Sequence, residues 1–266
     1  MGSGDLWLLI GNSRWHWAEA LAETAAEAGT AALHFSHGLP PPDLAVVPWN
    51  RLRAWAAVGP LPIQGEEGSR WLEQLESRRL PLERVPLQQL PPWLGIDRAL
   101  VGWQAWRCQA QRGRGAVLVA DAGTALSLTL VGATGNFAGG RLQPGLTTQI
   151  RSLGRTTALL PLLVPSPDGL EPLVEVMNPW PIETEQAMRV GCLLGLAAAV
   201  AQAWRDLQRL EPTSLWLTGG DAPGLAALLR KQQIPFELAP ELAMKALVAL
   251  SSDPDPRGSV EPFPPP

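Results

Sequence analysis

Two short polar turns follow apolar, strand-like runs and could bind phosphate. The first is Gly11-Asn12-Ser13-Arg14, which comes directly after the run Leu6–Ile10. The second is Ala122-Gly123-Thr124, which follows Asp121 at the end of the run that begins at Ala116. Such turns present backbone N–H groups to anionic oxygens. Each alone could be an ordinary hairpin turn, but two similar turns about half a chain apart favour a duplicated, nucleotide-facing arrangement.

Two further glycine pairs also stand beside predicted strands. Gly139-Gly140 is followed by Pro144-Gly145, where a helix is expected to begin, and Gly219-Gly220 ends the apolar run that starts at Ser214. Glycine allows the backbone to approach a ligand closely, so the second pair could lie against a flat aromatic base. Together these strand ends predict a cleft that binds a nucleotide.

Composition excludes several other kinds of chemistry. The net charge of -4 gives no basic surface for nucleic acid, so we expect no nucleic-acid partner. The only lysines, Lys231 and Lys245, do not stand in a P-loop, and the histidines His16, His34 and His37 lack zinc-site spacing.

The cysteines and the apolar segments indicate the compartment. Cys108 and Cys192 are far apart in apolar surroundings, which favours free thiols in a reducing compartment. The start lacks a signal-like apolar run, and the apolar stretch 192–204 is shorter than the roughly 20 residues of a membrane span. We therefore expect a cytoplasmic protein with no membrane partner.

The elements that would position these turns form two α/β halves. A polar break at Gln111–Gly115 precedes the strand at Ala116, so the predicted domains are 1–112 and 113–252, followed by a disordered, proline-rich tail at 253–266. Expected strands and helices follow from apolar runs and helical periodicity. The strands are Leu6–Ile10, Ala45–Val47, Ala56–Val58, two within Ala116–Gly132 and one at Ser214–Thr218, and the helices are Glu66–Arg79, Gly95–Gln111 and Thr184–Leu210.

In order and spacing, six segments resemble the type III pantothenate kinases of the acetate-and-sugar-kinase, Hsp70 and actin superfamily. They are IGNSR at 10–14, GIDRA at 95–99, DAGTALSLTLV at 121–131, GGRLQPGL at 139–146, TEQAMRVG at 184–191 and LTGGDA at 217–222. The resemblance implies two duplicated ribonuclease-H-like α/β domains that face each other across a nucleotide cleft. It also implies a homodimeric kinase that phosphorylates pantothenate with ATP, a divalent cation such as Mg²⁺, and a monovalent cation, K⁺ or NH₄⁺.

The resemblance also assigns roles residue by residue. It implies that Asp97 is the general base and that Asp121 binds the monovalent cation. It places the remaining roles in two groups. The ATP-binding positions are Gly11, Asn12, Ser13, Arg14, Gly123, Thr124, Gly219 and Gly220, and the pantothenate-binding positions are Gly95, Ile96, Asp97, Arg98 and Thr184.

Three of these residues also have structural interpretations. Asp97 could be a helix-start acid paired with its neighbours, and Asp121 could be a turn acid that accepts backbone N–H bonds. Thr184 could cap the helix that it begins. In each case both roles can coexist.

Two positions depart from the family pattern. Leu9 stands where most members have an aspartate, so we expect the divalent cation to be held mainly by ATP oxygens and water, at a strand end open to the cleft. Trp93 stands where the family offers an aromatic hydroxyl, and this chain contains no tyrosine.

Other function classes fit less well. A ribonuclease-H-like nuclease needs clustered acids, including one on the first strand, and Leu9 argues against it. No glycine turn has the Gly-x-Gly-x-x-Gly spacing of a dinucleotide-binding dehydrogenase. A catalytically silent regulator that binds ATP or pantothenate remains the main alternative, and ATP binding without turnover would identify it.

Overall fold

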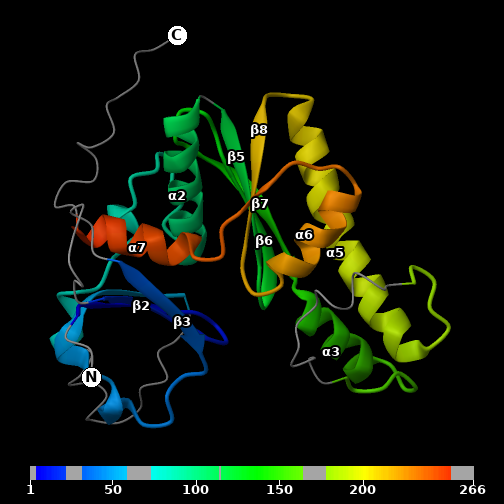
Figure 1. Ribbon diagram of the computed structural model, residues 1–266, viewed down its shortest axis with the longest axis horizontal. Helices are drawn as coiled ribbons and strands as arrows, with labels where there is room; N and C mark the ends of the chain where they lie inside the picture. The colour runs from blue at the N-terminus through cyan, green and yellow to red at the C-terminus, as the bar shows by residue number, and fades with distance from the viewer. Residues whose placement is uncertain (1–3, 22–31, 59–72, 114, 164–177, 253–266) are drawn as a thin grey trace. The chain divides into compact units, whose positions relative to one another are not determined.

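The computed structural model describes residues 4–21, 32–58, 73–113, 115–163 and 178–252. The chain divides into two compact units, the first made of Met1–Gln104 and Glu241–Pro266 and the second of Ala105–Pro240. Each unit contains one β-sheet with helices packed on it (Figure 1).

The first unit is built on a four-stranded sheet of order β3-β2-β1-β4. Its strands are β1 (Leu6–Ile10), β2 (Trp15–Ala20), β3 (Leu33–Gly38) and β4 (Leu52–Ala57). Strand β1 pairs antiparallel with β2 and parallel with β4. All five residues of β1 are buried, which explains why the strand reads as a continuous apolar run rather than an alternating one.

Both faces of β1 are covered. The C-terminal helix α7 (Leu242–Ser252) packs against β1, β2 and β4, and Trp7 Nε1 donates a hydrogen bond of 2.7 Å to Ser251 Oγ on that helix. Leu8 belongs to a second set of buried residues, rich in tryptophan, that includes Trp15, Trp49 and Trp55. This double burial fixes the end of β1, from which the first polar turn leaves.

The described part of the first unit also contains three single-turn 3₁₀ helices: η1 (Leu44–Val46), η2 (Trp49–Arg51) and η3 (Leu82–Arg84). The strand predicted at Ala45–Val47 is therefore wrong. The Val47 N–H instead bonds the Leu44 carbonyl at 3.2 Å, and Pro48 has no N–H with which to extend a strand ladder. Half of the helix predicted at Glu66–Arg79 lies outside the described residues. In the described half, residues 73–76 are helical and 77–79 are not, so the helix ends earlier than predicted.

The second unit is built on a five-stranded sheet of order β7-β6-β5-β8-β9. Its strands are β5 (Ala116–Ala122), β6 (Ala125–Val131), β7 (Phe137–Pro144), β8 (Thr213–Thr218) and β9 (Glu237–Leu238). Strand β5 pairs antiparallel with β6 and parallel with β8, as β1 does with β2 and β4. The strand–turn–strand prediction for Ala116–Gly132 is confirmed.

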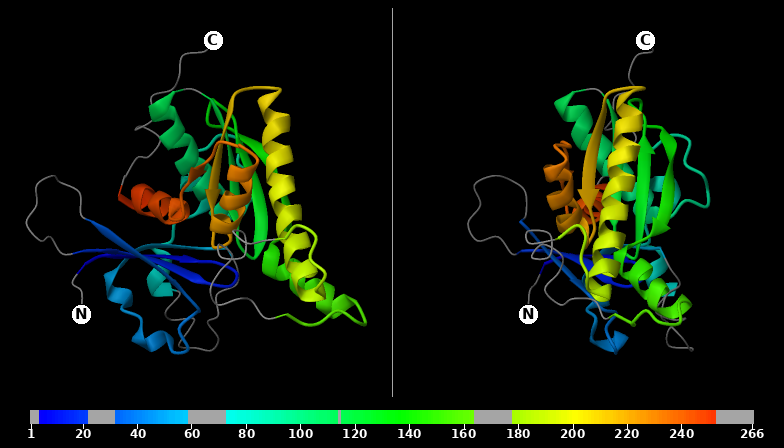
Figure 2. Two further views of the ribbon diagram at one scale, coloured as in Figure 1. Left: turned by 45° about the vertical axis from the view of Figure 1, so that its right-hand side comes forward. Right: turned by 90° about the vertical axis from the view of Figure 1, so that its right-hand side faces the viewer.

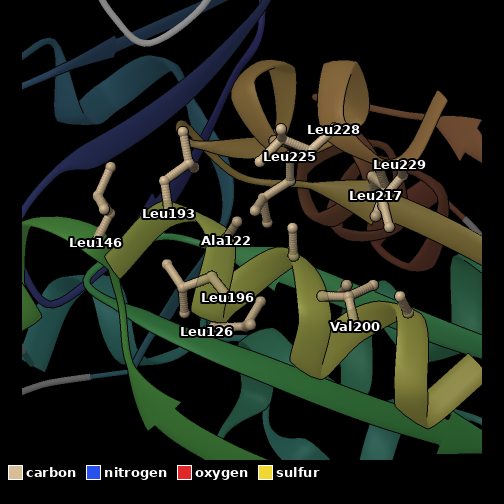
Figure 3. Packing of buried hydrophobic residues seen from close by; sticks show 14 of the residues in the cluster. Ala122, Leu126, Leu146, Leu193, Leu196, Val200, Leu217, Leu225, Leu228 and Leu229 are labelled. Carbon is tan, nitrogen blue, oxygen red and sulfur yellow. The ribbon is translucent and has the colours of Figure 1, made fainter. Parts of the chain in front are cut away.

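Helices α2 (Ile96–Arg112), α3 (Leu146–Thr156), α5 (Thr184–Gln208) and α6 (Ala222–Lys231) accompany these strands. In the second unit α5 runs beside the sheet with α6 next to it (Figure 2). Leu196 and Val200 of α5 lie among Leu126 of β6, Leu217 of β8 and Leu225 of α6 in one cluster of buried apolar side chains (Figure 3). Strands β5 and β8 pair in register from Ala116 with Thr213 to Asp121 with Thr218.

Helix α5 is, among the described residues, the one helix that is long and apolar enough to cross a membrane by length and composition alone. The sequence criterion, applied to the shorter stretch 192–204, did not select it. Half of its most apolar window is buried inside the protein.

The boundary between the compact units differs from the predicted domain boundary after residue 112. The division passes through α2, between Gln104 and Ala105, and α7 lies in the first unit. The reason for the second difference is physical, since the apolar face of α7 is buried against strands of the first sheet.

Candidate functional site

The first polar turn closes the hairpin between β1 and β2. Ile10 pairs with Trp15, and the Gly11 N–H donates to the Arg14 carbonyl at 2.9 Å. Asn12, Ser13 and Arg14 are exposed. The turn is therefore tight and solvent-accessible, as a phosphate loop must be, and that role stays a prediction.

Leu9 is not at an open strand end. Its side chain is 4% exposed, and its cross-strand partners are His16 on β2 and Ala56 on β4. The expectation that this position opens to a metal-bearing cleft is therefore not supported by the packing of the first unit.

Asp97 lies in the first turn of α2, where the helix dipole favours a negative charge. Its Oδ1 accepts the Arg98 N–H at 2.8 Å. Burial raises the pKa of this carboxyl, while the Arg98 N–H and the Arg98 charge oppose the rise. An acid held in this way can accept a proton more readily than a solvated aspartate.

Gly95 places the start of α2 beside the end of the first sheet. A Cβ at Gly95 would lie 2.6 Å from Asp97 Oδ1 and 3.9 Å from Val58 Cγ1. The Val58 N–H in turn bonds the carbonyl of Ile10, the residue before the polar turn. The segment Gly95–Arg98 and the first turn are thus joined through Val58, which follows β4.

In the second unit, Asp121 and Gly219 meet at the adjacent carboxyl ends of β5 and β8. Asp121 pairs with Thr218, and a Cβ at Gly219 would lie 2.4 Å from the Ala122 carbonyl oxygen and 2.6 Å from Asp121 Oδ1. Gly219 has φ of +91°, which side-chain-bearing residues rarely adopt. Ligands of α/β proteins commonly bind at this end of parallel strands.

The second polar turn is held by the segment that begins α3. The Gly123 N–H bonds the Ala125 carbonyl at 3.0 Å, and the Thr124 carbonyl accepts both the Gly145 N–H at 3.0 Å and Thr148 Oγ1 at 2.7 Å. A Cβ at Gly145 would lie 2.0 Å from the Gly123 carbonyl oxygen, so this close approach requires glycine. The sequence did not single out Thr148.

The oxygen atoms near Gly219 suit a weakly bound cation better than a divalent cation that is fully coordinated by protein ligands. Among the described residues, no cluster of three or more His, Cys, Asp or Glu side chains could hold a metal ion. Asp121 instead offers one carboxylate next to the Ala122 carbonyl oxygen, and hard oxygen ligands of this kind bind alkali or hydrated divalent cations.

Thr184 is the first residue of α5, and the helix N-cap is Glu183, so the capping role suggested for Thr184 is wrong. Its side chain is exposed. A pocket of about 400 Å³ lies nearby on the second unit and is lined by α3 and α5 residues that include Gln149, Met188 and Cys192. Thr184 itself is not among its lining residues.

One tryptophan and one histidine stand next to these segments of the first unit. Trp93, two residues before Gly95, is 84% exposed and thus available to a ligand. His16 was set aside with the other histidines for lacking zinc spacing, yet its Nε2 is 3.5 Å from where a Gly11 Cβ would lie. His16 pairs with Leu9, so the two side chains face the same side of the sheet, which is fixed by the register of β1 and β2 and not by either strand's sequence alone.

Known proteins resemble this chain over nearly its whole length. A family model for type III pantothenate kinase matches residues 84–206. The type III pantothenate kinase of Synechococcus elongatus is 34% identical over 262 residues, which cover 93% of this chain and 98% of the relative. That of Thermosynechococcus vestitus is 37% identical over 233 residues, 84% of this chain and 80% of the relative.

The fold has a solved counterpart as well. A protein described as a Baf family transcriptional activator from Campylobacter jejuni has a TM-score of 0.55 and 16% identity, covering 93% of this chain and 97% of that one. That likeness concerns the fold, whereas the sequence likeness to the enzymes spans nearly the whole of both chains. The chain belongs to the type III pantothenate kinase family.

Proposed function

We propose that this protein is an enzyme that transfers the γ-phosphoryl group of ATP to the hydroxyl of pantothenate. The product is 4′-phosphopantothenate, and the reaction is the first step of coenzyme A biosynthesis. The observation that carries the proposal is the 34% identity with a type III pantothenate kinase across 98% of that relative.

We assign the proton-accepting role to Asp97. Phosphoryl transfer passes through a loose transition state, so the protein mainly positions the alcohol and stabilises charge. The raised pKa of Asp97, caused by burial, suits a group that takes the hydroxyl proton as the bond to phosphorus forms. Gly95, Ile96 and Arg98 would orient pantothenate around it, together with Thr184.

The nucleotide is assigned to the polar turns and glycine corners. Gly11–Arg14 and Gly123-Thr124 would hold phosphates through backbone N–H groups, and Gly219-Gly220 would lie against the adenosine. A divalent cation bound to ATP would neutralise charge on the transferring phosphoryl group. Leu9 has no ligand atom, so that cation would rest mainly on phosphate oxygens and water.

We further infer that the two units are a duplicated ribonuclease-H-like pair that encloses the nucleotide. Their sheets share the order β3-β2-β1-β4 and β7-β6-β5-β8, with the same parallel and antiparallel pairings. Each half of the proposed nucleotide site follows the first strand of its sheet. The predicted domains 1–112 and 113–252 are proposed as part of the same inference.

A monovalent cation, K⁺ or NH₄⁺, is assigned to Asp121. Its Oδ1 would lie 2.6 Å from a Cβ at Gly219, so the carboxylate lies against this glycine, and no second acid is required for a singly charged ion. Turnover should therefore be faster in K⁺ than in Na⁺, and Asp121→Ala should abolish the difference. Equal rates of the wild type in the two salts would exclude this role.

We also propose a cytoplasmic homodimer that uses the second unit. Leu159, Leu162, Trp180 and Ile182 are large apolar side chains between 67% and 97% exposed, and the last two directly precede α5. We take these exposed side chains as the candidate interface, because large exposed apolar surfaces mark protein interaction sites. Light scattering should give twice the chain mass, and Ile182→Asp should shift it toward the monomer; a monomeric wild type would contradict the proposal.

The decisive experiment for the function is a direct product assay. Purified protein is incubated with ATP, Mg²⁺, K⁺ and pantothenate, and phosphopantothenate is followed by mass. Product formation in step with ADP would support the kinase. ATP binding without product would favour the silent regulator instead.

A further inference from the structure

A row of side chains crosses three strands of the first sheet on one face. Leu9 pairs with His16, and His16 pairs with His37, so the three side chains point to the same side. His16 Nδ1 lies 2.8 Å from His37 Nδ1, and the rings meet edge to face. His37 Nε2 lies 3.2 Å from Oε1 of Glu241, the residue before α7.

These contacts form a chain rather than a metal site. His37 uses one ring nitrogen for His16 and the other for Glu241, so the three groups cannot converge on one ion. At the far end, His16 Nε2 is the side-chain atom nearest to Gly11, and it makes no hydrogen bond within the described part of the chain. One end of the row therefore faces the first polar turn, and the other faces a carboxylate.

The hydrogen bonds of the row fix which nitrogen carries a proton. When His37 is neutral, the Glu241 carboxylate requires a proton on His37 Nε2. His37 Nδ1 is then an acceptor, so His16 must donate from Nδ1. His16 Nε2 is left as a bare lone pair, which repels a phosphate oxygen.

One added proton reverses this pattern. When His37 is an imidazolium, it donates to both Glu241 and His16, so His16 Nδ1 becomes the acceptor and its Nε2 carries hydrogen. Burial, the His37 charge and Arg14 lower the pKa of His16 to about 4, so His16 itself stays neutral in this pattern. Glu241 Oε2 is buried without a hydrogen-bond partner among the described residues, which leaves this carboxylate dependent on a cationic neighbour.

We propose that the His16–His37–Glu241 row couples nucleotide binding to the uptake of one proton, which turns His16 Nε2 into an N–H donor toward the phosphates held by Gly11–Arg14. The proposal rests on the nucleotide-binding role proposed for that turn. His16 contacts phosphate, while His37 and Glu241 act as positioning residues that set its tautomer.

The neighbouring charges do not supply this coupling by themselves. Among the described residues, Arg14 precedes His16 by two positions, and exposed Lys245 lies one helical turn beyond Glu241. Strands β1 and β4 contribute only Leu9 and Ala56 at this level of the sheet. Arginine and lysine side chains keep their charge through the range where imidazoles titrate, so a proton taken up there comes from an imidazole or from the nucleotide itself.

The test is calorimetric titration of the full-length protein with Mg²⁺-ATP from about pH 6 to 8.5, the range in which imidazoles titrate. Buffers with different ionisation enthalpies give the number of protons taken up. The wild type should take up close to one proton near the middle of this range, and its Kd for ATP should rise by up to about tenfold per pH unit at the alkaline end.

ATP itself also ionises in this pH range, and its contribution is the same in the wild type and in three variants. Differences between them therefore report on the protein. His37→Gln and Glu241→Gln should lose the proton uptake and most of the pH dependence of Kd. His34→Gln serves as the matched control, because His34 is an exposed residue of the same strand that pairs with Glu19 in a different row. It should behave like the wild type.

The outcomes separate this inference from the proposed function. ATP binding by the wild type without proton uptake, or equal uptake in the wild type and in His37→Gln, would overturn the proton coupling alone. Failure of the wild type to bind ATP would overturn the proposed nucleotide site and the coupling together.

Discussion

Asp97 combines the position and the electrostatics that a proton acceptor in phosphoryl transfer requires. The start of α2 and the Arg98 N–H stabilise its charged form, while burial raises its pKa more strongly. Without burial, the same aspartate would be a weaker base at neutral pH. The segment GIDR therefore joins a helix start to a desolvated carboxylate, and both interpretations of the sequence can hold at this residue.

The raised pKa predicts that Asp97 reduces stability at neutral pH. Between the pKa of the unfolded chain and that of the folded protein, the folded state retains a proton that the unfolded chain has lost. Stability contributed by this group therefore falls as pH rises through that window. Asp97→Asn should raise the unfolding temperature at about pH 7, with the gain shrinking toward about pH 4; a variant less stable at neutral pH would contradict the assignment.

Gly219 supports a second prediction, with its neighbour as the control. Its φ of +91° and the 2.4 Å approach of the Ala122 carbonyl leave no room for a Cβ, whereas a Cβ at Gly220 meets nothing within 4 Å. Gly219→Ala should lower the free energy of unfolding by roughly 1 to 3 kcal/mol and weaken ATP binding. Gly220→Ala should change stability by less than about 1 kcal/mol; equal stability losses in thermal unfolding would refute this account of the corner.

At the scale of elements, strongly apolar runs gave the most dependable predictions. Six elements lie where the sequence places them: strands β1, β5, β6 and β8 and helices α2 and α5. Each has a continuous apolar run or a long apolar face that is buried in the fold. The strand predicted at Ala45–Val47 is wrong because its apolar run is short. Three apolar residues next to Pro48 can make a single 3₁₀ turn as readily as a strand, and local sequence does not distinguish the two.

Strand β1 yields a prediction about the missing acid. Leu9 is 4% exposed between His16 and Ala56, so a carboxylate there would be desolvated. Leu9→Asp should lose on the order of 3 kcal/mol of stability, the usual scale for an unpaired buried charge. Leu9→Met, which nearly conserves volume, should lose less than about 1.5 kcal/mol.

Thermal unfolding with and without Mg²⁺-ATP checks this prediction. If Mg²⁺-ATP restores the wild-type unfolding temperature of Leu9→Asp, the position is open to the metal after all, and the buried arrangement of β1 is not the one that binds nucleotide.

At the scale of the whole molecule, long-range pairing limited what the sequence could reveal. The association of α7 with the first sheet joins segments more than two hundred positions apart, as the Trp7–Ser251 hydrogen bond illustrates. The same return of the chain brings Glu241 to His37. The polar turns and glycine corners were visible because each is local, whereas the His16 row depends on strand register and on this return.

The central claim is that the molecule is an active kinase even though Leu9 replaces an acid and the chain has no tyrosine. The most direct test compares turnover and ATP affinity in the wild type and Asp97→Asn, using phosphopantothenate formation and calorimetry. We predict that the wild type turns over and that the variant binds ATP with nearly unchanged Kd while kcat falls by about 10² to 10⁴. A wild type that binds ATP without forming product, or an Asp97→Asn variant with wild-type kcat, would contradict the account.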